Sequence, residues 1–175
     1  MADIKHPHKN VIDNYENIYP MISLIDESKT TYIRENLPIH LHASQVKLLK
    51  EANKHAKPHH RKLRINQYKK LKEDAEKIDD LFELHTKLYI KKYQKLESKG
   101  LVLVDTETDE LPFDVTLTDK GQEILKQIDD LEADWEKIVL QDVEDTEKLL
   151  AQIKKVANKA LPINYKHKKQ QKFVF

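Results

Sequence analysis

The sequence lacks cysteine altogether, and among its 175 residues it has only two glycines and six prolines. The absence of cysteine excludes disulfide bonds and thiolate chemistry. So few glycines and prolines leave room for few turns, which favours long helices. Both glycines, Gly100 and Gly121, stand at the two ends of one short stretch with the alternating pattern of β-strands.

No run of about 18 apolar residues occurs, so the sequence predicts no membrane span. Its first ten residues also lack the apolar segment of a signal peptide, and we therefore expect a cytoplasmic protein. Apolar residues make up 39% of the chain and recur with helical periodicity, so we expect a folded helical protein rather than a disordered one.

The net charge of +1 conceals a separation of charge along the chain. Residues 58–72 contain six lysines and arginines and no acid, whereas acid-rich runs lie at 76–80 and 141–147. Such a separation indicates an anionic partner on one face of the protein. The plainer alternative is a set of solvated helix faces.

Three helices are predicted from apolar residues that recur at alternating spacings of four and three. They are the stripes from Val11 to Ile25, from Ile124 to Ile138 and from Leu149 to Ala160. Pro20 interrupts the first stripe, and proline is tolerated in a helix only in the first turn. Either this helix is kinked at Pro20, or a new helix begins near Tyr19.

Another helix is predicted to begin at Ser44, which is a suitable N-cap, and to bury Val46, Leu49 and Ala52. A lysine-rich helix is predicted over residues 85–99. On a helical wheel, one side of this helix holds Tyr89, Tyr93 and Leu96. The opposite side holds Lys87, Lys91 and Lys95. This helix therefore has an apolar side for packing and a lysine stripe that faces away from it.

The two glycines bracket a predicted β-hairpin. Gly100 suits the left-handed position that ends a helix. Residues 101–104, LVLV, predict a buried strand, and residues 113–118, FDVTLT, predict a strand with apolar residues on one face only. Thr118 is placed to cap the next helix, and Gly121 in its first turn predicts close packing of the backbone against a neighbouring element.

The predicted order of elements is three helices, the lysine-striped helix, a two-stranded hairpin and two long helices, which indicates a winged helix-turn-helix. Residues 85–104 and 115–128 resemble the MarR family of bacterial transcriptional regulators. In that family the recognition helix ends in a leucine, an acid and KGLV, and LT-x-x-G opens a long helix after the wing. Here these motifs are LESKGLV at 96–102 and LTDKG at 117–121. The resemblance extends over about residues 10–161.

The resemblance implies a mainly α protein with a small two-stranded β wing. It implies N-terminal dimerisation residues 1–42, a winged helix-turn-helix domain at 43–118, and C-terminal dimerisation helices with a basic tail at 119–175. Such a protein would be a homodimeric repressor rather than an enzyme. It would need no cofactor, and it would read a near-palindromic operator in double-stranded DNA.

Base reading would fall to the exposed side of the recognition helix, residues 85–99. The candidate residues are Thr86, Lys87, Ile90, Lys91, Gln94 and Lys95. The alternative for this lysine stripe is an ordinary solvated helix face.

The loop of the wing departs from the family. The family's wing carries an Asp-x-Arg element whose arginine contacts DNA, but the loop DTETDELP at 105–112 has four acids and no basic residue. Because acids repel phosphates, we expect the basic segment before the recognition helix to supply the backbone contacts instead. The candidates are Arg61, Lys62 and Arg64.

The segment before the recognition helix is also longer than is usual in the family. Two alternatives are open. Residues 78–84 are the third helix and residues 58–76 are additional sequence, or the third helix begins near Ile65 and is long.

The resemblance further implies a small phenolic or lipophilic effector that releases the protein from DNA. The residues that could line its pocket are Tyr15, Tyr19 and Trp135, for which core packing is the alternative. The nine histidines include two clusters: His40 with His42, and His55 with His59 and His60. No motif fixes the three or four ligands that zinc needs, so no metal site is predicted.

Two other classes of function stay open at this stage. A winged helix can serve as a protein-interaction adaptor, which an acidic wing would suit. It can also organise DNA without reading a particular sequence.

Overall fold

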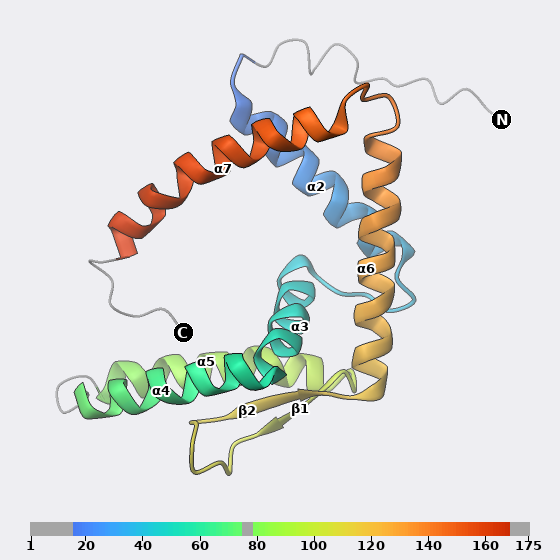
Figure 1. Cartoon of the computed structure of the whole chain (residues 1–175). Coiled ribbons are helices and arrows are strands. Elements are labelled where there is room, and N and C mark those ends of the chain that lie inside the picture. The colour runs from blue at the N-terminus through green and yellow to red at the C-terminus, as the bar shows by residue number, and fades with distance from the viewer. Residues whose placement is uncertain (1–15, 75–78, 169–175) are drawn as a thin grey trace. The chain divides into compact units, whose positions relative to one another are not determined.

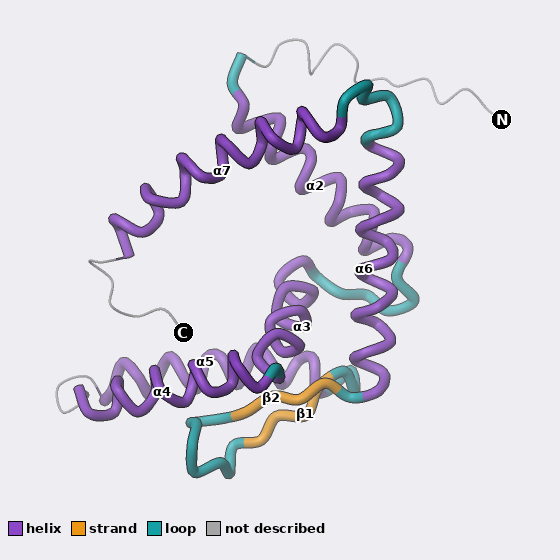
Figure 2. The backbone as a smooth tube through the Cα atoms, in the orientation of Figure 1, coloured by secondary structure: helices purple, strands orange, loops and turns teal. Residues whose placement is uncertain are grey.

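The structure is a computed structural model and describes residues 16–74 and 79–168 (Figure 1). These residues form six helices and one two-stranded antiparallel sheet, so helix predominates (Figure 2). In chain order the elements are α2 (Ile18–Asn36), α3 (Ala43–Ala56), α4 (Pro58–Asp74), α5 (Asp79–Glu97), β1 (Val102–Asp105), β2 (Asp114–Leu117), α6 (Asp119–Val139) and α7 (Thr146–Lys168). The predicted fold class, mainly α with a two-stranded wing, is confirmed.

The chain divides into two compact units, Met1–Trp135 and Glu136–Phe175. The described part of the first unit holds α2 to α5, the wing and most of α6, and that of the second unit holds α7. The division predicted at residues 42 and 118 stays a prediction. Within the described ranges, no helix is both long and apolar enough to cross a bilayer.

Helix α2 begins at Ile18, directly after an N-cap at Asn17 with extended backbone. Pro20 is therefore the third residue of the helix, in the first turn, where its missing N–H costs no helical hydrogen bond. The second alternative for Pro20, a new helix that begins near Tyr19, is thereby confirmed. Val11, the start of the predicted stripe, lies outside the described residues.

Helix α3 is capped by His42 rather than by Ser44, so the predicted N-cap was wrong. Gln45 is mostly buried, and its side-chain oxygen accepts a hydrogen bond from the backbone N–H of His42 at 3.1 Å. This bond from the N-cap to the third residue of the helix fixes the start of the helix two residues earlier than expected and places Ser44 inside the first turn. Leu49 and Ala52 are fully buried, as predicted, whereas Val46 is half-buried against the same core.

The basic segment forms a helix of its own, α4, which begins at Pro58 in the first helical position. It therefore does not begin near Ile65. Residues 79–84 are not a separate third helix either, because they are the first six residues of α5. The recognition helix predicted at 85–99 instead spans Asp79–Glu97. No glycine or proline interrupts this range, so nothing in the sequence stops the helix from extending towards its N-terminus.

Gly100 ends α5 as predicted. Its φ is +72°, and its N–H donates to Glu97 O at 2.7 Å while the Leu101 N–H donates to Leu96 O at 3.1 Å. These are the two hydrogen bonds of a Schellman motif. Leu96 and Leu101 are both fully buried, which supplies the apolar contact that accompanies the motif.

The wing is an antiparallel pair in which Val102 lies opposite Leu117 and Asp105 opposite Asp114. β1 is not buried throughout, because Leu103 points away from the core and is 60% exposed. The prediction of a fully buried strand was therefore wrong, since only one face of a two-stranded sheet is covered here. The alternation predicted for β2 is confirmed by the buried side chain of Val115.

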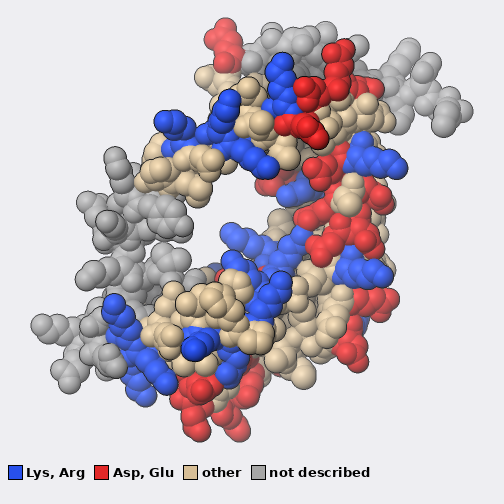
Figure 3. Space-filling model, in the orientation of Figure 1, with Lys and Arg blue, Asp and Glu red and all other residues tan. Residues whose placement is uncertain are grey.

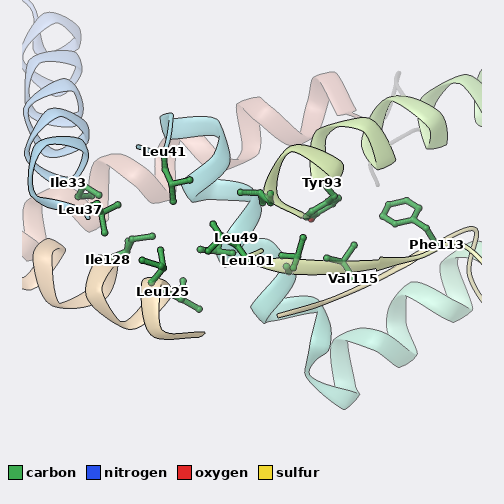
Figure 4. Close-up of a cluster of buried hydrophobic side chains, with 14 residues drawn as sticks. Ile33, Leu37, Leu41, Leu49, Tyr93, Leu101, Phe113, Val115, Leu125 and Ile128 are labelled. Atoms are coloured by element: carbon green, nitrogen blue, oxygen red, sulfur yellow. The ribbon is translucent and has the colours of Figure 1, made fainter. Parts of the chain in front are cut away.

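One hydrophobic core joins the helix-turn-helix, the wing and the lower part of α6 (Figure 4). Its most completely buried side chains are Leu41, Leu49, Leu96, Leu101, Val102 and Ile128. Figure 4 also shows Tyr93 of α5 and Val115 and Phe113 of the wing within this cluster. The core therefore sets the position of α5 relative to the wing.

The turn after β2 is hydrogen-bonded to the turn after α5. Thr118 Oγ1 accepts a hydrogen bond from the Gly121 N–H at 3.0 Å and donates to Gly100 O at 2.7 Å. The Thr118 N–H also donates to Leu101 O at 3.1 Å. The predicted N-cap and the predicted close approach at Gly121 are both confirmed.

A methyl group at Gly121 would overlap the carbonyl oxygen of Leu101 and come within 2.9 Å of its carbonyl carbon. Both atoms belong to the backbone, so relief requires α6 to shift. We expect Gly121→Ala to lower the free energy of unfolding by about 3 kcal/mol or more, at the upper end for overpacking. Urea denaturation followed by circular dichroism measures this loss.

Gly100→Ala is the matched control, because open space surrounds that position and only the left-handed backbone resists a side chain. It should cost about 1–2 kcal/mol. A Gly121→Ala protein as stable as the wild type would contradict the close contact.

Candidate nucleic-acid interface

Helix α5 presents most of its predicted base-reading side chains to solvent. Lys87, Lys91, Gln94 and Lys95 are exposed, and Thr86 and Ile90 are half-buried. The Lys87 ammonium group lies 2.7 Å from the Glu83 carboxylate one turn earlier, and both side chains are exposed. Within the described part of the chain, Lys91 and Lys95 have no ion pair. The lysine stripe therefore faces outward with most of its charge uncompensated.

The opposite side of α5 is anchored in the core. Tyr93 is 2% exposed, and its ring lies 6.1 Å from the ring of Phe113 in the wing. Burial raises the pKa of the Tyr93 phenol, so this side chain carries no charge at neutral pH. Lys92 lies over the Tyr89 ring at 5.0 Å, which fits a cation–π contact. Because one side of the helix is fixed, the lysine stripe has a fixed direction.

The two arginines of α4 reach the wing. The guanidinium group of Arg61 donates through Nε to Asp114 at 3.0 Å and through Nη1 to Glu110 at 2.8 Å. Arg64 donates through Nη1 to Asp114 at 3.2 Å and through Nη2 to the carbonyl oxygen of Phe113 at 3.5 Å. The phosphate contacts predicted for Arg61 and Arg64 stay a prediction, and the structure gives these two residues protein partners.

Other basic residues of α4 remain exposed. They are Lys62, Lys69, Lys70 and Lys72. Figure 3 shows lysines and arginines gathered over α4 and α5, with acids gathered at the tip of the wing and along α6. The separation of charge seen in the sequence is therefore also a separation in space within the first compact unit.

No protein-family model and no curated protein matches the sequence. Solved structures do match. The oxidised form of MarR from E. coli aligns with 87% of this chain and 99% of its own, at 19% identity and a TM-score of 0.53. The reduced form aligns over the same shares at 20% identity and a TM-score of 0.51. A mutant of MarR in complex with operator DNA aligns with 90% of this chain and 99% of its own, at 20% identity and a TM-score of 0.51.

The chain has the MarR fold. At this level of identity the likeness concerns the fold, and it confirms the architecture expected from the glycine-bracketed wing. In this MarR fold, α5 is the helix that precedes the wing, as predicted, although its bounds differ from those predicted; its role in recognition stays a prediction.

A groove of about 390 Å³ lies in the first unit of this MarR fold. Residues of α2, α3 and α6 line it: Asp26, Lys29, Thr30, Ile33, Arg34, Leu41, Ala43, Ser44, Val46, Lys47, Lys50 and Glu132. Lys50 crosses from α3 to α6, where it pairs with Asp129 at 3.1 Å and with Glu132. These contacts raise the pKa of Lys50 against the opposing effect of burial, so it stays charged.

Two of the residues predicted for an effector pocket, Tyr19 and Trp135, do not line this groove. Tyr19 is 76% exposed, and Tyr15 lies outside the described residues. The indole N–H of Trp135 donates to Ser28 Oγ at 3.3 Å and so ties α6 to α2. An effector pocket built from these three aromatic residues stays a prediction.

Both charged segments could be recognised in the sequence, but the ion pairs between them could not. Asp114 and Glu110 are the partners of the α4 arginines, although they lie about 50 positions later in the chain. The only signal available was that a segment with excess positive charge and a loop with excess negative charge occur in one small domain. That signal does not reveal which side chains pair.

His55 lies at the C-terminal end of α3, within reach of the charge of Arg64. Burial lowers its pKa to about 4, with help from the positive charges of Arg64, Lys54 and His60 and against the opposing effect of Asp114. The Glu51 carboxylate, 3.9 Å from its Nε2, is too distant for a hydrogen bond. His55 is therefore neutral at pH 7. Among the described residues, no group of three or more His, Asp or Glu side chains is placed to hold a metal ion.

The stability of the protein should therefore depend on His55 between about pH 6.5 and 4. An unfolded histidine has a pKa of about 6.5, so in this window the unfolded chain binds a proton that folded His55 rejects. The contribution is present above about pH 6.5 and is lost as the pH falls towards 4. Urea denaturation at several pH values should show a smaller loss for His55→Gln than for the wild type.

His59→Gln is the matched control, because it removes an exposed histidine from the neighbouring helix. An imidazole resonance of His55 that titrates near pH 6.5 in an NMR experiment would contradict the assignment.

Proposed function

We propose that the protein is a homodimeric transcriptional regulator that binds operator DNA, acts as a repressor, and works in the cytoplasm. The observation that carries this proposal is the exposed lysine stripe on α5, held rigidly from behind by Tyr93 and Leu96. In a helix-turn-helix the recognition helix enters the major groove, which an α-helix fits. The MarR structure with operator DNA supports the proposal, because it has the same fold.

Base reading in this proposal falls to six residues of α5, of which four are exposed and two are half-buried. They are Thr86, Lys87, Ile90, Lys91, Gln94 and Lys95. Lysine can donate to guanine O6 and N7, and glutamine can pair with adenine. The exposed lysines of α4, beginning with Lys62, would contact phosphates and would supply affinity that falls with salt.

Dimerisation in this proposal uses the apolar side chains that the folded chain leaves exposed. On α2 they are Ile18, Tyr19, Ile22, Leu24 and Ile25, and at the end of α6 and on α7 they are Ile138, Val139, Leu149, Leu150, Ile153, Val156, Leu161 and Ile163. So many large apolar side chains are rare on a monomer and are typical of an interface. A two-fold dimer would present two copies of α5 to the two halves of a near-palindrome.

A small phenolic or lipophilic effector would complete the regulator by releasing it from DNA. The groove lined by α2, α3 and α6 has the size of a small-molecule site. The three aromatic residues Tyr15, Tyr19 and Trp135 remain candidates for contact with such a molecule.

An adaptor that binds another protein is the second candidate function. It is favoured by the tip of the wing, where Asp105, Glu107 and Asp109 are exposed. None of the three has an ion pair among the described residues. Such a tip would attract a basic protein surface and would repel DNA.

A binding experiment on the DNA upstream of the protein's own gene tests the regulator. We expect a sequence-specific complex, and we expect Lys91→Gln with Lys95→Gln to weaken it at least tenfold, since each lysine contact to a base is worth about 1–3 kcal/mol. Fluorescence anisotropy over a salt series measures both quantities. Lys126→Gln is the matched control, because it removes an exposed lysine from α6 instead.

The same experiment separates the alternatives. Binding that does not depend on sequence would support a DNA-organising protein. The absence of binding would favour the adaptor.

Sedimentation at micromolar concentration tests the dimer. We expect the wild-type protein to sediment as a dimer and Ile153→Glu to dissociate it, because a carboxylate would be buried in an apolar interface. Asn158→Glu is the control, since Asn158 lies on the opposite face of α7. A wild-type monomer at this concentration would contradict the proposal.

A further inference from the structure

The wing has an unusual charge for an element beside DNA. Between Asp105 and Asp114 it carries five carboxylates, and residues 102–118 contain no lysine, arginine or histidine. In a winged helix-turn-helix on DNA, the wing lies close to the flanking phosphates, and uncompensated carboxylates would repel them. Positively charged groups must therefore offset the negative charge of the wing if the wing is to lie near DNA.

Two of the five carboxylates are offset from within the protein. We name the four residues Arg61, Arg64, Glu110 and Asp114 the arginine clamp. Asp114 is its centre, because each of its two carboxylate oxygens accepts a hydrogen bond from a different arginine, at 3.0 and 3.2 Å. Hydrogen bonds between ionised groups are shorter and stronger than neutral ones, so the clamp holds β2 against α4.

The inner part of the clamp is shielded from water. The side chains of Asp114 and Arg64 are only 17% and 19% exposed. Asp114 Oδ1 also accepts a hydrogen bond from the Val115 N–H at 3.0 Å, which ties its direction to the strand. If Arg64 turned away to a phosphate, it would leave a partly buried carboxylate with less compensation, and that is unfavourable.

The outer part of the clamp is more open. Arg61 is 39% exposed and Glu110 51% exposed, and the contacts with these two carboxylates raise the pKa of Arg61. Lys62, the next residue, is exposed and has no ion pair in the described ranges. Arg61 and Arg64 thus bind carboxylates of the wing, whereas Lys62 does not.

We propose that Arg61 and Arg64 are positioning residues that act on the wing rather than on DNA. They hold β2 in place and neutralise Glu110 and Asp114, so that the wing can lie beside a phosphate backbone. Contact with the phosphates falls to Lys62 and the other exposed lysines of α4. This role rests on the proposed function, because it matters only if the protein binds DNA.

The positioning role is tested by asking whether removal of the two partner carboxylates restores DNA affinity to a variant that lacks the two arginines. The full-length wild type is compared with Arg61→Gln/Arg64→Gln, with Glu110→Gln/Asp114→Asn, and with the combination of all four changes. The arginine variant should lose roughly tenfold in DNA affinity at low salt, since two carboxylates are released. The combined variant should return to within about threefold of the wild type, because the released charges are gone.

The salt dependence gives a second readout. If the arginines act only through the two carboxylates, the slope of log K against log salt in the combined variant matches that of the wild type, whereas Lys62→Gln lowers its magnitude by about one. Direct phosphate contact would instead lower the slope by about two in the arginine variant, and the wing changes would not rescue it. That pair of results would overturn the proposal.

Hydrogen exchange in the free protein separates this role from the proposed function. The amides of residues 102–117 should exchange faster in the arginine variant than in the wild type or in Lys62→Gln. A wild type that binds no DNA would refute the proposed function, and unchanged exchange would refute the positioning role. If the double variant does not fold, Arg61→Gln and Glu110→Gln, at the exposed end of the clamp, give the same comparison.

Discussion

The architecture depends on the backbone of Leu101. Its N–H closes the end of α5 by donating to Leu96 O, and its carbonyl oxygen accepts from Thr118 at the start of α6. Gly121 must then pass so close to that carbonyl that no side chain fits between them. Because the Leu101 side chain is also fully buried, one residue fixes the end of α5, the first strand of the wing and the start of α6 relative to one another.

A second constraint is electrostatic and acts at the other end of the wing. Asp114 would be a partly buried carboxylate without compensation if α4 did not supply Arg61 and Arg64. The basic composition of α4 and the acidic composition of the wing are therefore two halves of one interaction. What remains after this pairing is an excess of lysine on α4 and α5 and of acid at the tip of the wing.

The sequence predicts the features that depend on neighbouring residues. Gly100 and Thr118 could be assigned because a left-handed helix end and an N-cap are set by local geometry. The start of α5 could not, because nothing between Asp79 and Glu97 breaks a helix, and the family pattern suggested a shorter one. The pairing of Arg61 with Asp114 was equally hidden, since the two lie 53 positions apart and only the folded core brings them together. For the candidate site, the sequence thus gave the lysine stripe but not the clamp.

The span of the contacts has a consequence for the order in which the chain folds. The junction around Leu101 joins residues about 20 positions apart, for example Thr118 with Gly100. The hydrogen bond between Trp135 and Ser28 joins residues 107 positions apart. Closing a longer loop costs more entropy, and contacts of short span form earlier on average. We therefore expect the wing and the ends of its two flanking helices to form the folding nucleus, with α2 docking onto α6 afterwards.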